Sequence, residues 1–262
     1  DFAVSFYGGL GVSAALARIA EVAGSTGRIV GAGSANAAAR LRASTAGGEA
    51  RVQSSTPNPR DKPVIDRIGE IADRSLERYL GSRAIPVDLA RRYLSEMDYR
   101  IGADKFRALA FANNAGGYEV RTAAFKGSLG KKDIRTLGTS VGGDAALFEG
   151  VYDFLSVLAA HGRDEPAGRV IVLNSVNMVR RAIEAIQADS ISSLACYFDH
   201  DLAGEMAFAE LRREVELSRE RSIVVRDDSA LYSGYKDVNE WWIANALRDR
   251  LNDRGSQARG VF

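Results

Sequence analysis

The second half of the chain alternates short apolar runs with segments whose apolar residues recur at helical spacing. The runs at 145–148, 170–173, 194–198 and 222–225 are predicted strands, and the segments at 151–160, 178–188 and 202–219 are predicted helices. The run at 170–173 is continuous and rich in β-branched residues, which is typical of a strand buried on both faces. This order of elements predicts a parallel sheet with helices on both faces.

Acidic residues follow two of these strands. Glu149 and Asp153 come directly after the first, and Asp199 and Asp201 come after the third. Ligands of such sheets collect at the carboxyl ends of the strands, so we expect these side chains to lie close together. Crowded carboxylates repel one another unless a cation neutralises them, and oxygen-only ligands suit Mg²⁺ or Mn²⁺. Alternatively each acid caps the helix that follows it, although one cap per helix does not explain the pair Asp199 and Asp201.

Four motifs carry a resemblance to a known family. FEGVYDFLS, VIVLNS, YFDHDLAG and YSGYKDVNEWW follow one another in the chain, and together they resemble a Toprim domain. This metal-binding fold is shared by bacterial-type DNA primases, topoisomerases and some nucleases. The resemblance implies a Rossmann-like α/β sheet with flanking helices.

The resemblance also implies roles for five acids. Glu149 takes the place of the general acid or base, and it is expected to join the metal ligands Asp153, Asp199, Asp201 and Asp237. The last motif is weaker than the others, because Asn239 stands where a second acid often appears in replicative primases.

Residues 83–136 are similar to the segment before Toprim in primase-like proteins of plasmids and other mobile elements. There, a small α+β subdomain with basic residues lies against the nucleic acid. The segment holds eleven Lys/Arg and six Asp/Glu, a net charge of +5 (11 − 6), whereas the whole chain has +1. A localised basic face is what binding a polyanion requires. The residues expected to bind nucleic acid are Arg100, Arg121, Lys126, Lys131, Lys132 and, from the last motif, Lys236.

For some of these basic residues a second interpretation stays open. Arg121, Lys126, Lys131 and Lys132 lie among glycines that either let the backbone approach a ligand or simply form hairpin turns. Arg91 and Arg92 lie on a predicted helix and are expected to be ordinary solvated surface residues.

Composition favours a cytoplasmic globular enzyme. Hydrophobic residues make up 46% of the 262 residues, and neither a secretory signal nor a membrane-spanning run of about twenty apolar residues is visible. A single cysteine, Cys196, excludes a disulfide framework and a Cys-rich zinc site within the chain, and it is expected in the core. His161 and His200 are poor catalytic candidates, and no P-loop sequence is present.

We predict four regions. Residues 1–23 are interpreted as the tail of a CHC2-type zinc module, which proteins of the resembled family often carry, so that the chain is expected to be a truncated product without zinc. Residues 24–62, rich in Gly, Ala, Ser and Arg, are interpreted as a linker. Residues 63–140 would form the α+β basic subdomain, and residues 141–262 would form the Toprim domain with a C-terminal helix.

The function favoured by the sequence is a DNA primase-like nucleotidyltransferase in the replication of a mobile element or chromosome. It would use single-stranded DNA, nucleoside triphosphates and Mg²⁺ or Mn²⁺, with a replicative helicase or relaxase as a candidate partner and no membrane. A metal-dependent Toprim nuclease and a non-catalytic DNA-binding accessory protein remain alternatives. A topoisomerase is less favoured, because none of the nine tyrosines lies in the separate large domain that its nucleophile needs.

Overall fold

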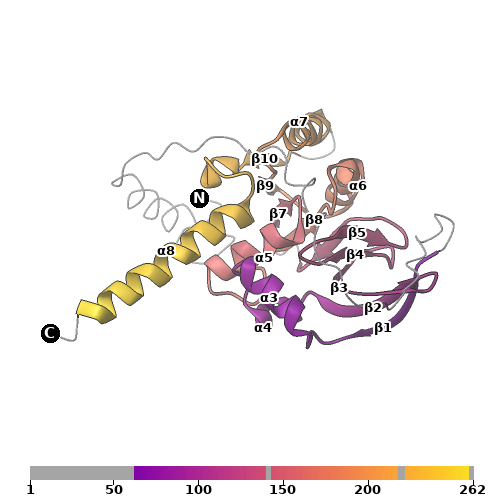
Figure 1. Cartoon of the computed structure of the whole chain (residues 1–262). Coiled ribbons are helices and arrows are strands. Elements are labelled where there is room, and N and C mark those ends of the chain that lie inside the picture. The colour runs from indigo at the N-terminus through magenta and orange to yellow at the C-terminus, as the bar shows by residue number, and fades with distance from the viewer. Residues whose placement is uncertain (1–61, 140–142, 218–221, 260–262) are drawn as a thin grey trace, which may run out of the picture.

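The computed structural model describes residues 62–139, 143–217 and 222–259, which form two five-stranded sheets and the helices packed on them (Figure 1). The predictions for residues 1–23 and for all but the last residue of 24–62 lie outside the described residues. No helix in the described part of the chain is long and apolar enough to cross a membrane.

The first sheet is antiparallel, and its strands are neighbours in chain order. They are β1 (Val64–Gly69), β2 (Ser95–Ile101), β3 (Asp104–Ala112), β4 (Tyr118–Arg121) and β5 (Lys126–Leu129). Helices α3 (Arg74–Ser82) and α4 (Val87–Arg91) connect β1 to β2. The carboxylate of Asp73 starts α3 by accepting hydrogen bonds from the backbone N–H groups of Ser75 and Leu76.

The second sheet has the strand order β10-β9-β7-β8-β6. Four strands are parallel: β7 (Asp144–Phe148), β8 (Arg169–Val172), β9 (Ser193–Tyr197) and β10 (Val224–Asp227). The predicted fold class is confirmed. The edge strand β6 (Arg135–Leu137), which pairs antiparallel with β8, was not predicted, because three residues are too few for a periodic pattern. The last strand lies two residues later than the sequence suggested.

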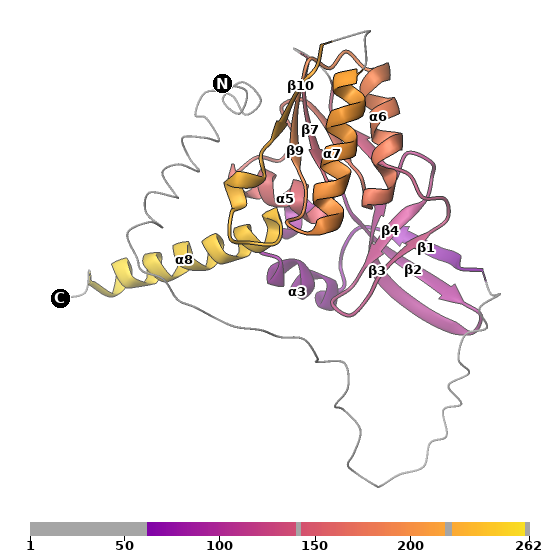
Figure 2. The ribbon, with the colours of Figure 1, turned by 90° about the horizontal axis from the view of Figure 1, so that it is seen from above.

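Helices cover both faces of this sheet (Figure 2). α5 (Val151–Ala160) and α8 (Val238–Arg259) lie on one face, and α6 (Val179–Ala188) and α7 (Leu202–Leu217) lie on the other. Two short 3₁₀ turns, η2 (Val176–Met178) and η3 (Ser229–Tyr232), precede α6 and α8. Successive side chains of each strand point to opposite faces of the sheet. Phe148 therefore packs toward α5, whereas Leu147 and the buried Cys196 pack toward α6 and α7.

The two sheets share one hydrophobic core. Leu109 and Phe111 of β3 pack with α3 and α4 into the same cluster as Phe148 and Phe154 of the second sheet and α5. The other face of the first sheet has a small core of its own around Met97 and Tyr99. The antiparallel sheet is therefore fixed against the α5 side of the parallel sheet.

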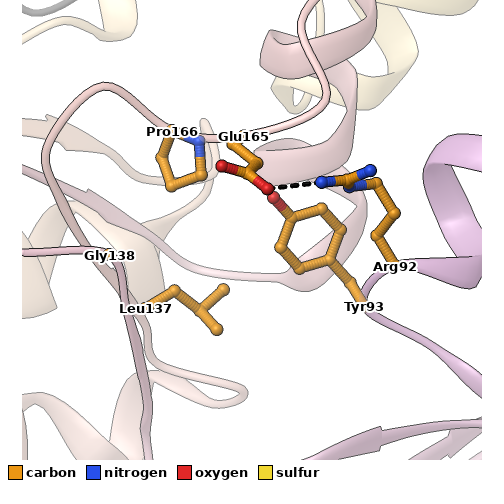
Figure 3. A pocket seen from close by; sticks show the side chains of 6 residues that line it. All are labelled: Arg92, Tyr93, Leu137, Gly138, Glu165 and Pro166. Carbon is orange, nitrogen blue, oxygen red and sulfur yellow. Dashed lines mark hydrogen bonds and ion pairs between the residues drawn. The ribbon is translucent and has the colours of Figure 1, made fainter.

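A second contact between the two parts lies beside α4 (Figure 3). The Tyr93 ring packs edge-on against Phe154 at 5.0 Å between centroids, and its hydroxyl donates to the Asp164 carbonyl at 2.7 Å. Arg92 forms an ion pair with Glu165 at the rim of a pocket of about 480 Å³. Arg91 donates to the Ile71 carbonyl at 2.9 Å. Arg92 is exposed, as predicted for a solvated surface residue, although it pairs with Glu165. Arg91 is only partly exposed and is fixed to the Ile71 carbonyl, so for Arg91 the prediction of an ordinary surface residue was wrong.

Candidate active site

A pocket of about 220 Å³ lies at the carboxyl ends of β7, β8 and β9, where the first sheet, α5 and the start of α8 meet it. Its walls carry acidic side chains from the second sheet and basic side chains from the first. The lining residues are Arg83, Arg121, Lys126, Glu149, Gly150, Val151, Tyr152, Asp153, Asn174, Asp199, Lys236, Asp237 and Asn239. Four of the five acids predicted from the sequence thus share one pocket, and Asp201 adjoins it through Lys236.

Glu149 follows β7 directly, and its position is fixed by the neighbouring strand. The rings of Phe148 and Tyr197, which end β7 and β9, are stacked at 4.7 Å between centroids. The Glu149 carboxylate accepts a hydrogen bond from the backbone N–H of Asp199 at 3.3 Å. Burial and then the negative charge of Asp199 raise the pKa of Glu149 to about 7. A carboxyl group with this pKa can both take and give a proton near neutral pH.

Asp153 lies in the first turn of α5, where it is buried. One of its oxygens accepts from the backbone N–H of Asn239 at 3.2 Å. Burial, followed by the charges of Asp237 and Asp199, raises the pKa of Asp153 well above its ordinary value. Burial and Asp237 also raise the pKa of Asp199. The pocket therefore crowds carboxyl groups together, and the protein only partly stabilises their charged forms.

Two of the five acids do cap helices. Asp201 Oδ1 accepts from the backbone N–H groups of Ala203 at 3.1 Å and Gly204 at 3.0 Å, and these bonds lower the pKa of Asp201. Asp237 Oδ1 accepts from the N–H of Glu240 at 2.7 Å at the start of α8. The capping interpretation thus holds for Asp201 and Asp237 and fails for Glu149, Asp153 and Asp199. In Asp201 the other oxygen, Oδ2, faces a cation instead.

That cation is Lys236. Its Nζ lies 3.3 Å from Asp199 Oδ2 and 3.5 Å from Asp201 Oδ2. Lys236 lies in the loop before α8, and His200 is bonded to the backbone of this loop. The backbone N–H of His200 donates to the Lys236 carbonyl at 2.7 Å, and its ring Nδ1 lies 2.6 Å from the Tyr235 carbonyl. His200 therefore joins two loops, and its ring contacts that of Tyr232 at 4.8 Å between centroids.

The donor set fits a hard divalent cation. Among the described residues, no three Asp, Glu, His or Cys side chains form a complete, preformed metal site. Mg²⁺, however, is commonly bound by one or two carboxylates together with water and substrate phosphate. Asp199 and Asp201 already place one oxygen each within 3.5 Å of the same positive charge, that of Lys236.

The basic wall of the pocket follows from strand register. Arg121 pairs with Leu109, so it shares the face of the first sheet that turns toward α5, and Lys126 lies opposite Arg121 on β5. Two cations directly opposite each other are unfavourable in a sheet. Burial lowers the pKa of Arg121, and its Nη1 is buried with no hydrogen-bond partner in the described part of the chain. Such a donor suits an anionic ligand.

The other basic residues predicted from sequence lie elsewhere. Arg100 donates to Asp66 on β1 at 3.0 Å, and Lys131 and Lys132 are exposed beyond β5, outside the pocket lining. The structure therefore brings Arg121, Lys126 and Lys236 to the site and leaves the other three away from it.

Sequence reasoning missed Arg83 and the part that Asn239 plays in holding it. The Arg83 guanidinium lies over the rings of Tyr79 and Tyr152, 5.5 and 5.2 Å from their centroids, and Nη1 donates to Asn239 Oδ1 at 2.9 Å. Asn239 is buried, and its amide donates to the Arg83 carbonyl at 3.0 Å and to Ser156 Oγ at 2.8 Å. A carboxylate could make neither of these two donations, which is a physical reason for asparagine at this position.

Asn174 was also missed. It is buried beside the pocket with φ +67°, and its amide donates to the Asp133 carbonyl at 3.0 Å. An asparagine directly after a buried strand is a recognisable signal for this left-handed conformation.

Comparison with known proteins agrees with this arrangement. Residues 146–242 match a family model described as Toprim-like, so the chain contains a Toprim domain, as the resemblance implied, and all five acids lie within it. Residues 65–130, which include Arg83, Arg121 and Lys126, match a domain of unknown function (DUF8464). No curated protein matches the chain.

Two matched solved structures contain primases. One is the primase fragment of the bacteriophage T7 primase-helicase protein, with 17% identity, 77% of this chain and 81% of that chain covered, and a TM-score of 0.49. The other is bacteriophage T7 lagging-strand DNA polymerase interacting with primase domains of two gp4 subunits bound to an RNA/DNA hybrid and dTTP. There the identity is 16%, the coverage 71% of this chain and 90% of that chain, and the TM-score 0.47.

Proposed function

We propose that this protein is a replication-related, primase-like nucleotidyltransferase that joins nucleotides on single-stranded DNA with the help of Mg²⁺ or Mn²⁺. The observation that carries the proposal is the pocket in which carboxylates of the Toprim domain face Arg83, Arg121 and Lys126 of the first sheet and its helices. Phosphoryl transfer needs this combination, because the polyanion must be held while charge develops at the reacting phosphate.

Each group then has a role that follows from its surroundings. Glu149, whose pKa is raised to about 7, accepts the proton of the 3′-hydroxyl as its oxygen bonds to the α-phosphorus of the nucleoside triphosphate and pyrophosphate leaves. Asp199 and Asp201 would hold the metal with the support of Asp153 and Asp237, and the metal, when bound, would stabilise negative charge at the phosphate. Arg121 lines the same pocket, its Nη1 is buried without a hydrogen-bond partner among the described residues, and its guanidinium is the group proposed to bind a phosphate oxygen.

The experiment is nucleotide incorporation. Incubating the protein with single-stranded DNA, labelled nucleoside triphosphates and Mn²⁺ should give short products. Glu149→Gln should abolish them while leaving DNA binding nearly intact, because the basic wall is untouched. Glu205→Gln, which changes an exposed acid at the start of α7, is the matched control and should behave like the wild type.

Two other outcomes would replace the proposal. Strand scission without incorporation, lost in Glu149→Gln, would assign the same carboxylates to a metal-dependent nuclease. DNA binding without any metal-dependent chemistry would assign the protein to the accessory class. A helicase or relaxase partner, the context of a mobile element and the zinc-free state stay predictions from the sequence.

A further inference from the structure

The loop before α8 places a lysine where it neutralises two carboxylates at once. Lys236 Nζ lies within 3.5 Å of one oxygen of Asp199 and one of Asp201. These are the two carboxylates to which the proposed function gives the metal. An ammonium group and a divalent cation cannot both occupy the space between the same two oxygens.

The backbone of Lys236 is held by hydrogen bonds, whereas its side chain is largely exposed apart from the two ion pairs. His200 donates to the Lys236 carbonyl at 2.7 Å, and the Lys236 N–H donates to Glu240 Oε2 at 2.5 Å. The Lys236 side chain is 57% exposed, whereas that of Asp199 is 15% exposed. The ammonium can therefore leave the aspartates by rotation of its own side chain, with no repacking of the core.

We propose that Lys236 is an exchangeable counter-ion: it neutralises Asp199 and Asp201 when no metal is bound, and the incoming divalent cation displaces it into the pocket that it lines. This inference rests on the proposed function, since it concerns the same metal site. It explains why the pair Asp199 and Asp201 is tolerated without metal, and it makes metal affinity depend on a residue that is not a ligand.

The test is Mn²⁺ binding by calorimetry, together with thermal unfolding in EDTA. Lys236→Met should bind Mn²⁺ about 5-fold more tightly than the wild type, because the competing ion pairs are gone. Without metal it should unfold about 2–4 °C earlier, and Mn²⁺ should abolish this difference. Lys236→Arg, which keeps the charge, should stay close to the wild type in both measurements.

Lys126→Met is the matched control. Lys126 lines the same pocket, but within the described residues no ion pair joins it to a pocket carboxylate. We expect its Mn²⁺ affinity to change by less than about 2-fold. An equal gain in Mn²⁺ affinity in Lys236→Met and Lys126→Met would show that any positive charge near the site weakens metal binding, and this would overturn the inference.

The remaining outcomes separate this inference from the proposed function. If Asp199→Asn/Asp201→Asn abolishes Mn²⁺ binding and Lys236→Met leaves it unchanged, the metal site stands and the counter-ion idea falls. If neither the wild type nor Lys236→Met binds Mn²⁺, both proposals fall. Binding by Lys236→Met alone would support the inference in its strongest form.

Discussion

Glu149 should make the metal-free protein less stable as the pH rises, and Glu149→Gln should remove this effect. In the folded state the pKa of Glu149 is about 7, against an ordinary value of 4.5. Between these two values the folded protein binds more protons than the unfolded chain, so the free energy of unfolding falls as the pH rises from about 4.5 through about 7. Below 4.5 the carboxyl group is protonated in both states and has no such effect.

The magnitude follows from the pKa. A difference of about 2.5 between about 7 and 4.5 corresponds to about 3 kcal/mol. Because Glu149 is only partly buried, solvent screening reduces this to about 1–2 kcal/mol. Glutamine has nearly the same shape and can still accept from the Asp199 N–H. We therefore expect Glu149→Gln to be more stable than the wild type by about 1–2 kcal/mol at pH 8, and equal to it near pH 4.5.

The assay is urea unfolding in EDTA at several pH values between 4.5 and 8, followed by circular dichroism. Glu205→Gln controls for the loss of one negative charge outside the pocket. Adding Mn²⁺ at pH 8 should stabilise the wild type more than Glu149→Gln, since only the wild type has a charged carboxylate at position 149 for the cation to neutralise. Equal stabilities at pH 8, or a less stable Glu149→Gln, would refute the electrostatic account of this site.

Three further predictions concern the basic wall, the first turn of α7 and the start of α8. Arg121→Ala/Lys126→Ala should weaken single-stranded DNA binding and lower its salt slope by about 1.4, at roughly 0.7 for each phosphate contact. The control Lys131→Ala/Lys132→Ala, outside the pocket, should change the slope less, and an equal change would show that DNA does not bind at the pocket. Gly204→Ala should destabilise the protein by about 1–3 kcal/mol in thermal unfolding, because its Cβ would lie 2.3 Å from the Asp199 carbonyl, whereas Gly81→Ala in open space on α3 should not destabilise it. Asn239→Asp should lower the free energy of unfolding by about 1–3 kcal/mol, because two buried hydrogen bonds lose their donor, and an unchanged urea midpoint would contradict this.

The parallel sheet and the acidic wall could be predicted from the sequence because both depend on local patterns. Continuous apolar runs mark buried parallel strands, and acids placed directly after them must lie at one edge of the sheet. The match of residues 146–242 to the Toprim-like family agrees with that reading. Both signals lie within a few residues of each strand end, which is the range over which sequence patterns are informative.

The basic wall depends on long-range register, which local patterns do not contain. Arg100 and Arg121 have the same charge and both lie in strands. Arg100 donates a hydrogen bond to Asp66 on the neighbouring strand β1, whereas Arg121 lies on the face of the sheet that turns toward α5. The difference depends on which residue of the neighbouring strand lies opposite each of them. Arg83 could not be assigned for a related reason, since its hydrogen-bond partner Asn239 is 156 residues away in the chain.

Capping and metal binding, which appear as alternatives in the sequence, are compatible in the structure. A carboxylate has two oxygens, and a helix N-terminus uses only one of those of Asp201, leaving Oδ2 to face Lys236. Because the cap fixes the orientation of the group, the second oxygen is already directed when a cation arrives, and less conformational entropy is lost on binding. Under the proposed function, the start of α7 would therefore orient a metal ligand as well as begin a helix. The same reasoning applies to Asp237. It caps α8 with Oδ1, which leaves its other oxygen unused by the helix, and the residue lines the pocket.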